Sequence, residues 1–169
     1  MGATGWAYFV PYQANVEDAL QELRKGVFER GKYGHTHAIA PDALAAMPAQ
    51  LREAVQRLRE LEAQRLGGPS RKFRSIDDLL EASAENGTHS ILDIRHTASG
   101  PGFGVAWPAP LVTVGAVYGT EKPTRADIQK AGQGALESAM KLERWQAVFV
   151  IAYDQHRPCE LYFEGVSGD

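Results

Sequence analysis

Apolar positions near the N-terminus alternate with other residues, in the pattern of a β-strand. Trp6, Tyr8 and Val10 occupy alternate positions in an aromatic-rich run, which favours extended backbone. Pro11 limits this strand or places it at a sheet edge, because proline lacks the N–H that an inner strand donates. We therefore expect a strand from about residue 5 to residue 12.

The C-terminal pattern predicts a β-hairpin. Residues 147–152 are apolar at every position, as in an inner strand that is covered on both faces. After a polar turn, Leu161 and Phe163 alternate with Tyr162 and Glu164. This second strand is expected to have one core face and one solvated face, with Tyr162 and Glu164 on the solvated side.

Helical spacing of apolar residues appears in the first half of the chain. Asn15 can cap a helix that Gly31 closes. A longer tract begins at Pro41 and ends at Gly67, and Pro48 either kinks it or marks its true first turn. The charged face of this second tract predicts a helix on the outside of the molecule.

Two more helices are predicted further along. Ser75 begins a short third helix, and Thr124 opens a last helix whose apolar stripe reaches Leu142. Residues 88–95 are expected to form a strand between turn signals. Residues 105–118 are ambiguous, since their valines favour a strand and their spacing also fits a short helix.

The order of these elements indicates an α+β fold. A mixed or antiparallel sheet with about four helices packed against it and a C-terminal β-hairpin fits that order. The length of 169 residues, with 44% hydrophobic and 23% charged residues, predicts one soluble domain over residues 1–169. No internal repeat or low-complexity tract interrupts it.

Charge and cysteine content exclude several classes of function. A net charge of −3 provides no basic field for a phosphate backbone, so neither nucleic acid nor an anionic membrane surface is an expected partner. No apolar run approaches the roughly 20 residues that span a bilayer, and the first residues lack a basic secretory signal. The single cysteine, Cys159, fits a reducing cytoplasm.

The densest polar segment, residues 88–96, contains the strongest candidates for chemistry. On a strand, His89, Asp93 and Arg95 would share a face, with His96 on the other. His89 and Asp93 would then lie about 13 Å apart, too far to ligate one ion, so no metal site is predicted. A helical conformation would remove this objection. A surface pair of Asp93 and Arg95 is the simpler interpretation.

Three other features are weighed against ordinary structural roles. His35 and His37 have metal-site spacing but no evident third ligand. Cys159 shares strand parity with core residues, which favours a buried thiol over a reactive one. The glycine-rich loop at 100–104 matches no phosphate-binding motif, although it could display Phe103 and Trp107 to a partner.

Four blocks of the sequence resemble those of a family of small bacterial proteins. They are Tyr8-Phe9-Val10-Pro11-Tyr12-Gln13, Gly87-Thr88-His89-Ser90-Ile91-Leu92-Asp93-Ile94, Gly119-Thr120-Glu121-Lys122-Pro123-Thr124-Arg125 and Glu160-Leu161-Tyr162-Phe163-Glu164-Gly165. The resemblance covers both ends and the middle of the chain. It implies a single domain, and it brings no reaction, cofactor or site residue with it.

The leading hypothesis is a non-catalytic protein of the bacterial cytoplasm that binds another protein, in a regulatory or immunity-like role and without a cofactor. Its candidate binding residues are Tyr8, Tyr12, Phe103 and Trp107. The alternative is a small hydrolase or transferase with its site around His89, Asp93 and Arg95. A self-associating structural protein is a third possibility, based on Tyr162 and any exposed sheet edge.

Overall fold

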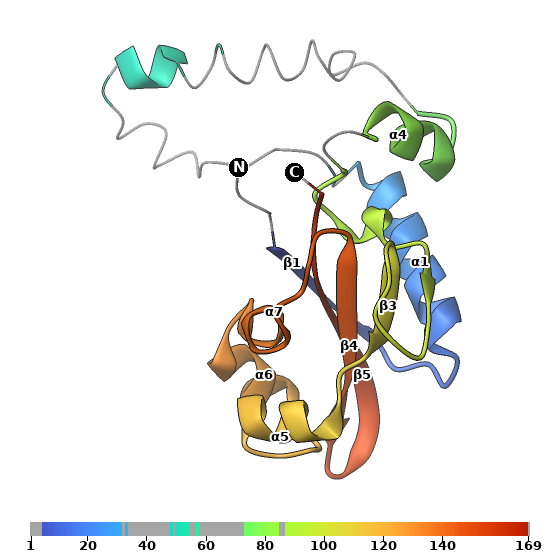
Figure 1. Cartoon of the computed structure of the whole chain (residues 1–169), viewed down its shortest axis with the longest axis vertical. Coiled ribbons are helices and arrows are strands. Elements are labelled where there is room, and N and C mark those ends of the chain that lie inside the picture. The colour runs from blue at the N-terminus through green and yellow to red at the C-terminus, as the bar shows by residue number, and fades with distance from the viewer. Residues whose placement is uncertain are drawn as a thin grey trace.

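The computed structural model describes residues 5–31, 33, 48, 50–54, 57, 73–84 and 87–168. These residues form one mixed five-stranded sheet with the strand order β1-β5-β4-β3-β2 (Figure 1). The strands are β1 (Gly5–Pro11), β2 (His96–Thr97), β3 (Val105–Pro108), β4 (Gln146–Asp154) and β5 (Arg157–Val166). β5 pairs antiparallel with both β1 and β4, whereas β4, β3 and β2 run parallel. The predicted α+β class and the C-terminal hairpin are confirmed.

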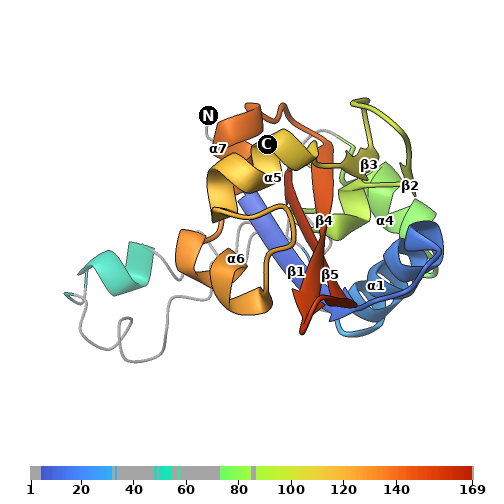
Figure 2. The same cartoon turned by 90° about the horizontal axis from the view of Figure 1, so that it is seen from below.

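Helices cover both faces of the sheet (Figures 1 and 2). On one face lie α1 (Val16–Glu29), α4 (Ile76–Ala82) and the short 3-10 helix η1 (Ile91–Asp93). On the other lie α5 (Leu111–Tyr118), α6 (Arg125–Ala131) and α7 (Ala135–Met140). Two separate apolar cores result, and the sheet lies between them.

Caps and glycines set the helix ends much as the sequence predicts. Asn15, Ser75 and Thr124 each accept a hydrogen bond from a main-chain N–H in the first turn of the following helix. The predicted last helix is divided into α6 and α7. Gly132 and Gly134 both have φ +86°, a left-handed conformation that ends α6 and re-aims the chain before α7.

The predicted strand over residues 88–95 is wrong. Residues 91–93 form η1, and only His96–Thr97 pair as a strand. Ser90 Oγ accepts a hydrogen bond from Leu92 N–H at 3.2 Å, and this local bond begins the helical turn. The ambiguous segment 105–118 contains both predicted elements, since β3 ends at Pro108 and α5 begins at Leu111.

The predicted solvated face of β5 is also wrong. Tyr162 is 3% exposed and Glu164 is fully buried, because α5, α6 and α7 cover the face of the sheet on which both lie. The predicted helical tract from Pro41 to Gly67 lies largely outside the described residues, and His35 and His37 lie wholly outside them. None of the described helices combines the length and the apolar character that a membrane span requires.

Candidate functional site

Asp93, the central residue of the predicted polar segment, is 3% exposed and organises its own loop. Its Oδ1 accepts a hydrogen bond from Thr88 N–H at 2.6 Å. Thr88 and Ser90 hydroxyls share a hydrogen bond of 2.9 Å beside it. A Cβ at Gly87, where φ is +70°, would lie 2.8 Å from Asp93 Oδ2, so the loop main chain packs directly on the carboxyl group. Burial raises the pKa of Asp93, and the hydrogen bonds from Thr88 offset only part of that effect.

His89 and Arg95 do not join Asp93 around a common cavity. His89 is half-buried, with a left-handed φ of +52°. Arg95 is exposed, and its side-chain carbons lie against the position of a Cβ at Gly104. None of these three residues lines the pocket described below. Among the described residues, no group of three or more His, Cys, Asp or Glu side chains is placed to hold a metal ion.

The four predicted binding residues are dispersed over the molecule. Tyr8 and Tyr12 are half-buried against the core beneath α1, and burial raises the pKa of Tyr8. Phe103 is 66% exposed and lies 5.1 Å from Trp145 between ring centroids. Trp107 is in β3 rather than in a loop, and its 6% exposure places it in the core beneath α5. Only Phe103 is displayed as the sequence predicts.

Strand β1 ends at Pro11 and lies at one edge of the sheet, so both alternatives raised by Pro11 hold. Tyr12 N–H donates to Cys159 O at 3.0 Å, which fixes the parity of the antiparallel ladder. The main-chain groups of one residue point to the same side, and successive residues alternate. The even-numbered residues of β1 therefore bond to β5, and Gly5, Ala7, Phe9 and Pro11 face away from it.

The two ends of this outward edge are closed, and its middle is open. Gln133 Nε2 donates to Gly5 O at 3.0 Å. Pro11, at the other end, has no N–H to offer. Within the described part of the chain, the outward N–H and C=O groups of Ala7 and Phe9 bond to nothing. We call this stretch the open edge of β1.

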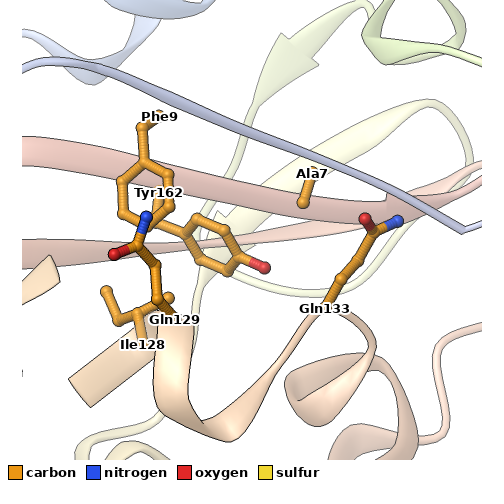
Figure 3. A pocket seen from close by; sticks show the side chains of 6 residues that line it. All are labelled: Ala7, Phe9, Ile128, Gln129, Gln133 and Tyr162. Atoms are coloured by element: carbon orange, nitrogen blue, oxygen red, sulfur yellow. The ribbon is translucent and has the colours of Figure 1, made fainter. Parts of the chain in front are cut away.

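A pocket of about 330 Å³ adjoins the open edge (Figure 3). Its lining consists of Ala7, Phe9, Ile128, Gln129, Gln133 and Tyr162. Two β1 residues thus supply both the open main-chain groups and part of the wall. The lining side chains are apolar, aromatic or amide, and none of them is charged.

A buried carboxylate lies beneath the pocket floor. Tyr162 Oη donates to Glu164 Oε2 at 2.6 Å, and Glu137 N–H of α7 donates to Glu164 Oε1 at 2.6 Å. The N-cap of α7 is Gly134, which has no side chain for capping, so Glu164 replaces a cap from across the fold. Burial and the hydrogen bond to Glu164 raise the pKa of Tyr162.

A second carboxylate, that of Glu137, lies outside the pocket lining and next to the N-terminal end of β1. Glu137 Oε2 is so close to the Gly5 main chain that a Cβ there would lie 2.6 Å from it. Burial and the nearby Glu164 raise the pKa of Glu137. They raise the pKa of Tyr118 as well. Glu137 is a neighbour of the Gln133 end of the pocket, because Gln133 donates to the carbonyl oxygen of the same Gly5.

A cation lies at the opposite end, where Arg125 covers Phe9. Its guanidinium carbon is 4.3 Å from the Phe9 ring centroid, and its side chain forms an ion pair with Glu160. Arg125 is thus already neutralised. Along β1, this satisfied ion pair lies beside Phe9 and Glu137 lies beside Gly5, and among the described residues Glu137 has no Lys or Arg partner.

Sequence reasoning gave the edge position of β1 as one of two alternatives and missed the pocket. Gln129 lies in α6 and Gln133 follows the end of that helix at Gly132, so no helical spacing in the sequence marks the two as neighbours. Tyr162 and Glu164 were predicted to be solvated, which concealed their place beneath it. No protein-family model, no curated protein and no solved structure matches this chain.

Proposed function

We propose that this chain is a non-catalytic protein-binding module of the bacterial cytoplasm, with a regulatory or immunity-like role, that binds an extended segment of another protein along the open edge of β1. One observation carries the proposal: unpaired main-chain donors and acceptors at Ala7 and Phe9 lie directly beside a pocket. In strand addition, main-chain hydrogen bonds supply affinity and adjacent pockets supply specificity.

The ends of the edge define the length of that segment. A residue pair such as Ala7 and Phe9 spans about 7 Å, which is two residues of an incoming strand. Gln133 closes one end and Pro11 the other, so pairing is confined to the centre of β1. Natural proteins commonly protect edge strands against uncontrolled association in this way. The gap left in the middle supports recognition of a partner strand.

The alternative of a small hydrolase or transferase around His89, Asp93 and Arg95 has one supporting observation, the raised pKa of Asp93. Asp93 accepts a hydrogen bond from Thr88 of its own loop and interacts with Ser167 near the C-terminus, and both contacts favour an organising role over a catalytic one. The protein-binding proposal rests on the outward N–H and C=O groups of Ala7 and Phe9, which have no hydrogen-bond partner in the described part of the chain.

The proposal is tested by removing one outward N–H group. Ala7→Pro deletes the N–H that faces away from β5 and leaves the β1–β5 ladder bonds in place. Ala7→Val is the matched control, because it adds similar volume and keeps the N–H. A display library of short random peptides is selected on the wild-type protein, and the selected peptides are titrated against all three proteins.

We expect the selected peptides to slow hydrogen exchange of the Ala7 and Phe9 amides. Their affinity should fall about tenfold in Ala7→Pro, the effect of losing one hydrogen bond of about 1.4 kcal/mol, and persist in Ala7→Val. Selection of no peptide, or binding that leaves both amides unprotected, would show that the open edge is not the binding site.

A further inference from the structure

We infer that the partner segment inserts a basic side chain, lysine or arginine, into the pocket beside the open edge of β1, with its cationic group next to Glu137. This inference rests on the proposed function, since the side chain comes from the segment paired with β1. It adds the chemistry by which the module selects its partner.

Charge complementarity is the first argument. Glu137 lies next to Gly5, whose carbonyl oxygen is bound by Gln133 of the pocket, and Glu164 lies behind Tyr162. Within the described residues, no Lys or Arg pairs with either carboxylate. Arg125, the cation beside Phe9, is held by Glu160. Glu164 has compensation from the Tyr162 hydroxyl and the α7 N-terminus. Glu137 is half-buried without a cation, so a positive ligand would be stabilised there.

The walls of the pocket suit the stem of a long basic side chain. Ala7, Ile128 and the rings of Phe9 and Tyr162 provide apolar surface for methylene groups. A cation is also attracted to the face of an aromatic ring. The Tyr162 hydroxyl donates a hydrogen bond to the Glu164 carboxylate, and this bond increases the electron density of the Tyr162 ring. The same walls would offer an acidic side chain no favourable contact.

Gln133 supplies an acceptor at the charged end. Its Nε2 is engaged by Gly5 O at 3.0 Å, which orients the amide. In Figure 3 the amide oxygen lies on the side of Tyr162, and the nitrogen lies away from it. This oxygen offers an acceptor to an ammonium or guanidinium group that enters the pocket. The Gln133 amide oxygen and the Glu137 carboxylate both accept hydrogen bonds, and ammonium and guanidinium groups can only donate them.

The geometry of strand pairing places the side chain correctly. Ala7 and Phe9 project their side chains toward α6 and also carry the open main-chain groups. Side chains of a paired strand alternate between the two faces of the sheet. Every second residue of the added strand would therefore project over the pocket, and one basic residue is enough to fill it.

The test uses three peptides built on one alternating threonine and valine sequence, blocked at both ends. Their central residue is lysine, norleucine or glutamate. Titration of the wild-type protein is expected to give binding about tenfold tighter for lysine than for norleucine, and weakest for glutamate. In Glu137→Gln the lysine and norleucine peptides should bind within about twofold of each other. Glu143→Gln makes an equal charge change at an exposed site outside the pocket, and it should keep the tenfold preference for the lysine peptide over the norleucine peptide.

The outcomes separate this inference from the function on which it rests. Equal binding of lysine and norleucine peptides to the wild-type protein, with protected Ala7 and Phe9 amides, would overturn the basic side chain and leave strand binding intact. A lysine preference that survives in Glu137→Gln would also overturn it. Failure of all three peptides to bind would count against the proposed function itself.

Discussion

Asp93 shows how a single buried carboxyl group links loop conformation to pH. The carboxyl is closely surrounded by Thr88 and Gly87, and burial raises its pKa. In the unfolded chain an aspartate titrates near its ordinary pKa of about 3.9. Between that value and the raised pKa, the folded protein holds a proton that the unfolded chain releases. The free energy of unfolding therefore decreases as pH rises through this window.

We predict that Asp93→Asn removes this dependence. An asparagine keeps an oxygen for Thr88 N–H and does not titrate. The free energy of unfolding of the wild type, relative to the variant, should decrease as pH rises above about 4 and level off above the raised pKa. Urea denaturation of both proteins over a series of pH values measures it. If the free energy of unfolding of the wild type relative to Asp93→Asn stays constant or increases with pH, burial does not raise the pKa of Asp93.

The turn of the β4–β5 hairpin is an element with stored conformational strain. Gln155 and His156 have φ values of +46° and +65°, as a two-residue type I′ turn requires. For residues other than glycine and asparagine, this left-handed backbone costs roughly 1 kcal/mol each. The right-handed twist of the paired strands nevertheless enforces it.

We predict that the double substitution Gln155→Asn and His156→Gly stabilises the protein. Asparagine followed by glycine is the preferred sequence for this turn, so the gain should be about 1 kcal/mol. The melting temperature should rise by about 2–4 °C for a chain of this size. Thermal denaturation followed by circular dichroism measures it. His156→Ala serves as the control, because it gains no left-handed preference, and an equal rise there would refute the explanation.

The same elements show what the sequence could predict. The hairpin was predictable from a continuous apolar run and an alternating run on either side of a polar turn, and α1 was predictable from its apolar spacing and its Asn15 cap. Residues 88–95 were not, since Ile91, Leu92 and Ile94 are all fully buried and so follow no period of two. Local hydrogen bonds that Ser90 and Asp93 accept from Leu92 N–H and Thr88 N–H decide the conformation there.

The candidate site depended on contacts that are distant in sequence. The edge position of β1 was one of the two alternatives that Pro11, a local feature, raised. No local feature predicted the pocket, because it needs Gln133 to reach Gly5 across 128 positions of the chain. The alternation around Tyr162 and Glu164 predicted solvent, and only the packing of α5 to α7 shows otherwise. A polar residue on a covered face has the same local signature as one on a solvated face.

At the scale of the whole molecule, one sheet joins two cores. Alternate residues of β4 and β5 enter opposite cores, so neither core can form while the central strands are unpaired. Helices on the two faces therefore depend on the same hydrogen-bonded ladder. This arrangement predicts that a destabilising substitution in either core lowers the stability of both cores.

Two leucines and two tryptophans allow that coupling to be measured. Leu20 of α1 and Leu136 of α7 are fully buried on opposite faces, and Trp6 and Trp107 report from the same two cores. Leu20→Ala and Leu136→Ala should each lower the free energy of unfolding by about 2–5 kcal/mol. In proteins that retain one reporter, with Trp145 and the other tryptophan replaced by phenylalanine, urea unfolding followed by fluorescence should give the same midpoint from either face.

Each leucine substitution should lower both midpoints equally, because a single cooperative transition reports one free energy wherever the probe lies. The two cores do not touch each other except through the sheet, so the double variant should lose the sum of the two single losses. A lower midpoint at Trp107 alone in Leu136→Ala would show instead that the α5–α7 layer unfolds separately. In that case the pocket beside β1 would open before the sheet does, and partner binding would be coupled to local rather than global stability.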